Sequence, residues 1–259
     1  MMKNMRYLVY TIIAILMPKV VTAITNDTVV LNAFSGIYPG LGGGEFTAYT
    51  SDQTMLSYYS ASAIVNTEGT WNGVSQGFET FCIETGVEFT PGNWGGPAYS
   101  YTVGNVAEPT PGTPGTGSGQ VLTLGTAFLY YEFATGNLAG FDYTYGADRE
   151  NDDNLLQAAI WYLQGGQTYG SFTVPTVENN SYYALAESEF GLGATNANNG
   201  EYSVGILQLW NSDGTAAQNQ LVLTGDDPTP APDGGMTVGL LGLGLVGAVA
   251  IQLWRRKDD

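Results

Sequence analysis

The sequence predicts a mainly β body, a sandwich or barrel with a small helical insert, followed by one C-terminal transmembrane helix. Three observations support this fold class. Short tracts rich in β-branched and aromatic residues recur between turn residues, which is the pattern of strands in all-β domains. Residues 153–164 place apolar side chains at helical spacing. Residues 236–254 contain no charged side chain, which is typical of a membrane-spanning helix.

The predicted strands lie between residues 28 and 224. The last two are separated by Asn211-Ser212-Asp213-Gly214, a turn sequence that predicts a closing hairpin. Residues 105–120 are rich in Gly, Pro and Thr and predict a loop that buries no core. The strand tracts are residues 28–34, 45–49, 56–65, 78–84, 99–106, 171–174, 202–210 and 220–224.

Three stretches of the body depart from the β pattern and predict helices. Residues 124–134 are closed by Gly136, and residues 181–190 begin at Ser181 as N-cap and stop at Gly191. Residues 153–164 are the strongest helix, because acidic residues precede them and Gly165 ends them. The apolar stripe of this helix consists of Leu156, Ala159, Ile160 and Leu163.

The first 23 residues predict a secretory signal peptide. Lys3 and Arg6 precede an apolar run over residues 7–17, and Val21-Thr22-Ala23 supplies the small residues of a cleavage site. The run is too short to span the hydrocarbon core of a membrane, which favours cleavage over an uncleaved anchor. We therefore expect residues 24–224 to form one domain outside the cytoplasm.

The other end of the chain combines a linker, an apolar helix and a basic tail. Residues 225–235 form the linker with the motif Pro232-Asp233-Gly234, and residues 236–254 form the predicted transmembrane helix. Arg255, Arg256 and Lys257 begin the tail of residues 255–259, which the positive-inside rule places in the cytoplasm.

This layout resembles the C-terminal sorting signals of the PEP-CTERM group, and its Pro-Asp-Gly core resembles the VPDSG variant. The resemblance implies recognition by an exosortase, a membrane protease or transpeptidase of Gram-negative bacteria. It also implies release to the cell surface or matrix after processing. A simple membrane anchor is the alternative.

Composition excludes several classes of function. The chain has no histidine and one cysteine, so it has no Ser-His-Asp or Cys-His catalytic pair, no histidine-ligated metal and no intrachain disulfide. A net charge of −17 disfavours nucleic-acid binding. We expect no cofactor and no enzymatic turnover.

Acidic residues gather just before the strongest helix. They lack the spacing of an EF-hand loop, and helix N-termini favour acidic residues, so we predict no metal there. Arg149 lies among them and is expected to pair with a neighbouring acid. These acids are Asp148, Glu150, Asp152 and Asp153.

Two residues stand out as candidates for chemistry. Cys82 lies in an apolar, strand-like run where its thiol is shielded from water. Gln157 lies at the flank of the apolar stripe of the predicted helix, where a polar side chain is costly without a partner. Taken singly, the cysteine is an ordinary small buried side chain and the glutamine an ordinary hydrogen-bonding group.

The motifs Phe81-Cys82-Ile83-Glu84 and Leu156-Gln157-Ala158-Ala159-Ile160-Trp161 resemble the paired motifs of bacterial surface thioester domains. In that family the cysteine precedes the glutamine, and its sulfur condenses with the side-chain carbonyl of the glutamine, expelling ammonia. The resemblance implies that Cys82 is the sulfur donor and Gln157 the acyl donor. It also implies adhesion.

The chemistry of a thioester suits this composition. A thiolate leaves more readily than an amine, so an amine displaces it and forms a stable amide without a histidine. Between residues 24 and 254 the only basic residue is Arg149 and there is no lysine, so the obvious internal amines are missing.

The sequence therefore predicts an exported cell-surface or matrix-associated adhesion protein that attaches covalently to an amine through Cys82 and Gln157. The alternative is a non-covalent structural or carbohydrate-binding protein of the envelope or matrix with an inert cysteine. A hydrolase based on paired carboxylates is a third interpretation, but nothing in the sequence selects such a pair.

Overall fold

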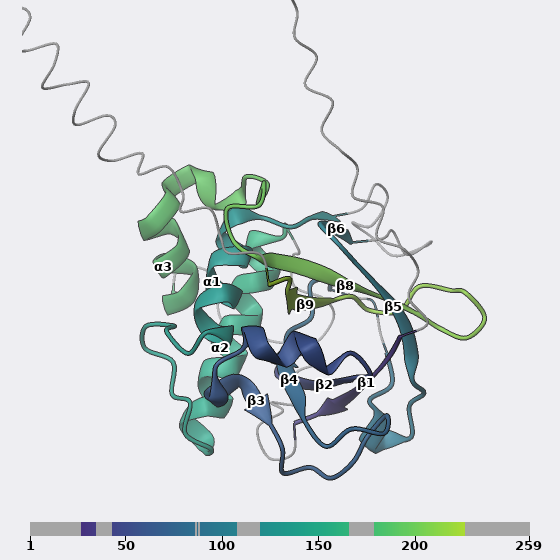
Figure 1. Ribbon diagram of the computed structural model, residues 1–259. Coiled ribbons are helices and arrows are strands. Elements are labelled where there is room, and N and C mark those ends of the chain that lie inside the picture. The colour runs from purple at the N-terminus through teal and green to yellow at the C-terminus, as the bar shows by residue number, and fades with distance from the viewer. Residues whose placement is uncertain are drawn as a thin grey trace, which may run out of the picture.

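The main feature of the molecule is a seven-stranded antiparallel sheet with helices gathered on one side of it (Figure 1). The computed structural model describes residues 27–34, 43–85, 87, 89–107, 120–165 and 179–225. The prediction of a mainly β fold is confirmed by this sheet. The predicted signal peptide, sorting motif, transmembrane segment and basic tail lie outside the described residues. Within the described part of the chain, no helix has the length and apolar character needed to cross a bilayer.

The order of strands in the sheet differs from their order in the chain. The first two strands lie at its centre, and the two C-terminal strands form one edge. From edge to edge the strands are β3 (Ile64–Val65), β4 (Gly77–Thr80), β2 (Phe46–Thr50), β1 (Thr28–Ala33), β5 (Tyr99–Gly104), β8 (Val204–Trp210) and β9 (Gln220–Leu223). A separate two-stranded ladder consists of β6 (Val106–Ala107) and β7 (Gln120–Val121).

The segment that follows β4 joins the β3–β4 end of the sheet to strand β9 at the opposite edge. The Ile83 N–H donates to the Asn219 carbonyl oxygen at 3.2 Å, and the Leu221 N–H donates to the Phe81 carbonyl oxygen at 3.1 Å. Strand β9 is thus hydrogen bonded both to β8 and to the residues after β4. Cys82 lies at the centre of this junction, directly opposite Gln220.

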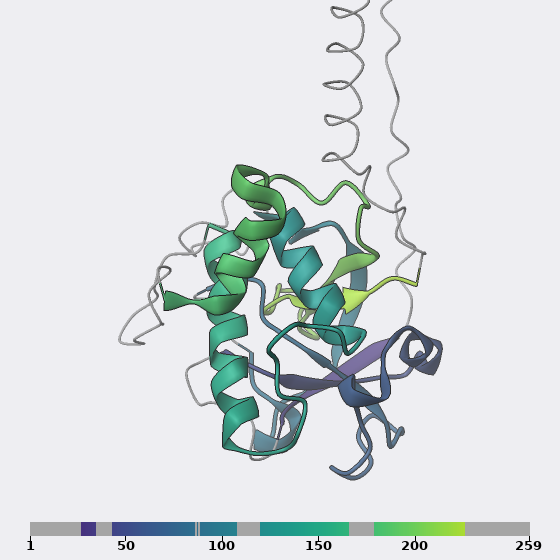
Figure 2. The same cartoon turned by 90° about the vertical axis from the view of Figure 1, so that its left-hand side faces the viewer.

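Three helices pack against one another beside the sheet (Figure 2). They are α1 (Leu124–Ala134), α2 (Ala147–Leu163) and α3 (Ser181–Phe190). Between the helices and the sheet lies a core of fully buried aromatic and aliphatic side chains. Its largest members include Tyr99, Tyr130, Tyr182, Phe78, Phe81 and Phe133.

The helix predictions are confirmed in position, with two corrections. Helix α2 begins at Ala147, six residues before the predicted start, so the preceding acidic residues belong to its first turns. The N-cap of α3 is Asn180 rather than Ser181, because the Asn180 carboxamide accepts from the N–H groups of Tyr182 and Tyr183. The same Asn180 side chain donates to the Leu155 carbonyl oxygen at 2.7 Å and so ties α3 to α2.

The predicted strand over residues 56–65 is wrong for most of its length. Residues Gln53–Tyr58 and Ala61–Ala63 form 3-10 turns, and only Ile64–Val65 pairs as a strand. The Asp52 side chain accepts from the Thr54 N–H at 3.1 Å, and such a local bond favours a turn over an extended chain. The predicted closing hairpin is confirmed, since β8 pairs with β9. Residues 171–174 lie outside the described residues.

Candidate functional site

The fold brings Cys82 and Gln157 together, although they are 75 residues apart in sequence. Cys82 follows β4 in the segment that pairs with β9, and Gln157 projects from the middle of α2. Both side chains are buried, with exposed fractions of 0% and 3%. The site therefore lies where the helical layer meets the junction of the sheet.

The Gln157 carboxamide is held against the backbone of Cys82 by two reciprocal hydrogen bonds. The Cys82 N–H donates to Oε1 of Gln157 at 3.0 Å, and Nε2 of Gln157 donates to the Cys82 carbonyl oxygen at 2.8 Å. A third bond comes from the Gly44 N–H, which donates to the same Oε1 at 3.1 Å. The carboxamide is consequently fixed in place and in orientation.

The two N–H groups on Oε1 have a chemical consequence. When a nucleophile adds to the Gln157 carboxamide carbon, negative charge develops on this oxygen. Two backbone donors aimed at an acyl oxygen form an oxyanion hole, and such donors stabilise the charge without having to reorganise. The Cys82 residue that supplies one of the donors also carries the thiol of the pair.

Apolar side chains surround the pair. Trp161 lies one turn beyond Gln157 on α2 and covers Gly43, where an added Cβ would lie 2.4 Å from Cζ2 of the Trp161 ring and 3.2 Å from Cγ of Gln157. A glycine is thus required for the indole to lie over the site. The cluster around the thiol consists of Ala33, Phe46, Cys82, Phe89 and Trp161.

The Cys82 sulfur has two hydrogen-bond donors. Nε2 of Gln220 lies 3.4 Å from the sulfur, and the Gly44 N–H also bonds to it. Burial raises the pKa of the Cys82 thiol far above its usual range and the charge of Glu84 raises it further, while the two donors oppose the rise. The thiol is therefore protonated at neutral pH.

Glu84 is buried two residues after Cys82. Its carboxylate accepts from the Asn219 N–H at 3.0 Å and from the Asn219 side-chain amide. Burial raises the pKa of Glu84 to about 7, and these bonds only partly oppose the rise. A group that titrates near neutral pH thus lies beside the thiol.

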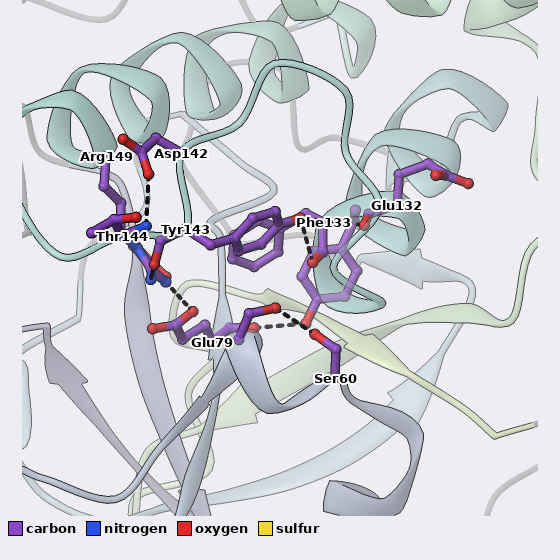
Figure 3. Close-up of polar contacts among 11 residues, drawn as sticks. Ser60, Glu79, Glu132, Phe133, Asp142, Tyr143, Thr144 and Arg149 are labelled. Carbon is purple, nitrogen blue, oxygen red and sulfur yellow. Dashed lines mark hydrogen bonds and ion pairs between the residues drawn. The ribbon is translucent and has the colours of Figure 1, made fainter.

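A buried ion network around Arg149 lies about two helical turns before Gln157 on α2. Arg149, with an exposed fraction of 4%, pairs with both Glu45 and Glu79. Figure 3 shows its guanidinium group reaching from α2 toward Glu79, beside Tyr143. The guanidinium also donates to the Tyr143 carbonyl oxygen at 2.8 Å and lies over the ring of Phe34. Arg149 thus pairs with acids that are distant in the chain, so the prediction that it pairs with a neighbouring acid is wrong.

The carboxyl groups around Arg149 have shifted pKa values. Burial and the charge of Glu45 raise the pKa of both Glu79 and Asp153 well above the usual range of a carboxyl group. The pKa of Glu45 is lowered, because its hydrogen bonds and the charge of Arg149 outweigh its burial.

The acidic residues at the start of α2 have separate partners. Oδ2 of Asp152 accepts from the Asp142 N–H at 2.7 Å, whereas Asp153 points to the ion network. Among the described residues, no three metal-ligating side chains of the His, Cys, Asp or Glu type are grouped so as to hold a metal ion.

Sequence reasoning identified Cys82 and Gln157, but it missed Gly44 and Gln220. Gly44 contributes a backbone N–H, which no side-chain motif reveals. Gln220 comes from the last strand, and its place beside Cys82 depends on the pairing of β9 with the segment after β4. No local sequence signal predicts that pairing.

We expect a Gly43→Ala substitution to destabilise the fold by about 1–3 kcal/mol, because the added methyl group overlaps the Trp161 ring. Urea unfolding measures the change. Gly193→Ala is the matched control, since its Cβ would meet its nearest neighbour at an ordinary 3.5 Å. Equal stability of the two variants would contradict the close approach of Trp161 to Gly43.

Stability is expected to fall as the pH rises toward neutral. A folded-state pKa raised from 4.5 to about 7 means that the contribution of Glu84 is present below pH 4.5 and lost as the pH rises through about 7. The loss amounts to about 3 kcal/mol for this group. Urea unfolding across this range should show a shallower pH dependence for Glu84→Gln, and an identical dependence would refute the assignment.

The Arg149→Met variant is expected to lose about 3–5 kcal/mol of folding free energy, because it leaves buried carboxyl groups without their positive partner. Thermal and urea unfolding measure this loss. Asp148→Asn, at an exposed position one residue earlier on the same helix, serves as the control. A loss no larger than that of the control would show that the network contributes little to stability.

Comparisons with protein-family models, with curated proteins and with solved structures find no match for this chain. A function consequently has to be inferred from the residues of the chain itself, above all from the Cys82–Gln157 pair and the groups around it.

Proposed function

We propose that this chain is an exported adhesion protein of the cell surface or extracellular matrix that forms an internal thioester between Cys82 and Gln157. The thioester would attach the protein covalently to an amine on a partner surface. The observation that carries the proposal is the buried Gln157 carboxamide, bonded to both backbone groups of Cys82, with its oxygen between two N–H donors.

These contacts support the formation of the bond. The Cys82 sulfur attacks the carboxamide carbon of Gln157, and charge on Oε1 is stabilised by the N–H groups of Gly44 and Cys82. The C–N bond then breaks, and the nitrogen leaves as ammonia with the proton of the thiol. Before the reaction, the bond from Nε2 to the Cys82 carbonyl oxygen holds the carboxamide in the required orientation.

The surroundings of the site support storage of the bond. Water is kept away by the apolar cluster around Cys82, and the raised pKa of the thiol makes it a poor leaving group. The described body contains no lysine, so no internal amine of that type competes for the acyl group. The bond thus persists until an external amine reaches it.

Export and anchoring complete the proposal. Residues 1–23 would direct secretion, residues 236–254 would hold the body outside the cytoplasmic membrane, and Arg255, Arg256 and Lys257 would retain the tail inside. An exosortase would recognise the motif Pro232-Asp233-Gly234 and release the protein to the surface or matrix.

The hydrogen bonds between β9 and the segment after β4 favour the barrel over the sandwich form of the fold.

The test is the mass of the full-length protein, purified in detergent without added amines. We expect the wild type to be lighter by one ammonia than the mass calculated for the same processed chain, and to gain one methylamine at Gln157 when that probe is added. Cys82→Ala and Gln157→Ala are the controls, and both should have their full sequence mass.

A wild-type chain of full mass with an intact Gln157 would refute the thioester. In that case Cys82 would be alkylated after unfolding, as expected of a non-covalent structural or carbohydrate-binding protein with an inert cysteine. A deamidated residue 157, absent from the Cys82→Ala control, would instead support a thioester that water has already hydrolysed.

A further inference from the structure

The Gln220 side chain occupies an unusual position beside the Cys82 sulfur. Gln220 begins β9, has an exposed fraction of 0% and lies directly opposite Cys82 across the backbone bridge. Its Nε2 donates to the sulfur at 3.4 Å. Its Oε1 is buried and has no hydrogen-bond partner among the residues that the structure describes.

This arrangement of the Gln220 side chain is unfavourable for the stability of the fold. A sulfur atom is a weak acceptor, so the donor of Gln220 gains little from it. A buried amide oxygen without a partner costs about 1–3 kcal/mol, because it has lost its bonds to water. A nearby residue, Gln218, has the more usual arrangement, since its buried Nε2 donates to the Glu84 carbonyl oxygen at 3.0 Å. The position of Gln220 suits a site in which the sulfur gains charge and the oxygen gains a donor.

We propose that Gln220 is a catalytic residue for cleavage of the Cys82–Gln157 thioester by a primary amine. Its Nε2–H stabilises the departing sulfur, and its Oε1 accepts an N–H of the attacking amine. This assignment rests on the proposed function, because it requires the thioester to exist.

The balanced step begins when the nitrogen of the amine attacks the thioester carbon. Charge passes to Oε1 of Gln157, which the N–H groups of Gly44 and Cys82 stabilise. The C–S bond then breaks and its electron pair goes to the sulfur. One proton moves from the nitrogen to the sulfur, which leaves an amide at Gln157 and a free thiol at Cys82.

The geometry of the Gln220 carboxamide explains why it can assist both the departing sulfur and the attacking amine. The two polar atoms of a carboxamide lie about 2.2 Å apart by covalent geometry. Oε1 of Gln220 is therefore within about 6 Å of the sulfur whose bond is replaced, given the 3.4 Å separation of Nε2 and Sγ. An attacking amine approaches the carbon bonded to that sulfur. A primary amine retains an N–H for Oε1 throughout the reaction, whereas a thiol nucleophile has none.

The sulfur needs this assistance because its surroundings oppose negative charge. Burial and Glu84 both disfavour the thiolate. The Gly44 N–H is shared between the sulfur and Oε1 of Gln157, so Gln220 is the donor dedicated to the sulfur. Without it, the leaving group becomes poorer while the fold keeps the rest of its contacts.

The test compares wild type, Gln220→Met, Gln220→Glu and the matched control Gln218→Met as full-length proteins in detergent. Each is incubated until its mass stops changing, so that slow formation of the thioester does not affect the comparison. Thermal unfolding confirms that each variant is folded. The rate of reaction with methylamine is then followed by mass, and a second series uses 2-mercaptoethanol as a nucleophile without an N–H group.

We expect Gln220→Met to reach the wild-type thioester content and to react with methylamine about tenfold to a hundredfold more slowly, the usual effect of one hydrogen bond to a charged group. Gln220→Glu should be slower still, because a carboxylate lacks the N–H and also adds negative charge beside the sulfur on which negative charge develops. The reaction of Gln220→Met with 2-mercaptoethanol should slow less than its reaction with methylamine. Gln218→Met should match the wild type.

Two results would overturn the assignment. One is a Gln220→Met protein that reacts with methylamine at the wild-type rate. The other is a folded Gln220→Met protein that never forms the thioester. A residue that acts only on reaction rates changes how fast the thioester forms and not how much of it is finally present. A wild-type protein without a thioester is a different result, since it refutes the proposed function itself before any Gln220 variant is compared.

Discussion

The position of the Cys82–Gln157 pair depends on the ion network around Arg149. This network joins the three segments that form the site. Glu45 immediately follows Gly44, Glu79 lies three residues before Cys82, and Asp153 lies one helical turn before Gln157 on the same face of α2. A buried charge without its partner is costly, so the segments are held in one arrangement. Cys82 and Gln157 lie just beyond these fixed points.

The hydrogen bonds of Gln157 satisfy two requirements at once. A buried carboxamide must find partners, and the backbone of Cys82 with the Gly44 N–H supplies them. The same partners place the acyl oxygen between two donors and the acyl carbon beside a residue with a thiol. Contacts that stabilise the fold are thus also the ones that the proposed thioester would use, and none of them requires a histidine.

Protection and reactivity are in opposition at this site. Burial and the nearby Glu84 raise the pKa of the Cys82 thiol, which would make the sulfur a poor leaving group and slow the loss of the proposed bond to water. The Gly44 and Gln220 donors act in the other direction, because they stabilise charge on the sulfur. The half-buried Trp161 packs against Gly43 beside Gln157, and its indole fits there only because residue 43 is a glycine. The balance of these effects sets the lifetime of the proposed bond.

The sequence by itself determined the elements with strong local signals. The helices over residues 124–134 and 181–190, the closing hairpin and the two candidate residues followed from periodicity, turn residues and motifs. Where local bonds compete with the strand pattern, as at Asp52, the prediction failed. Only the tertiary structure decided that Arg149 pairs with strand residues, and that Gly44 and Gln220 meet at Cys82. These contacts join residues distant in the chain, and a local pattern holds no information about which distant segments pack together.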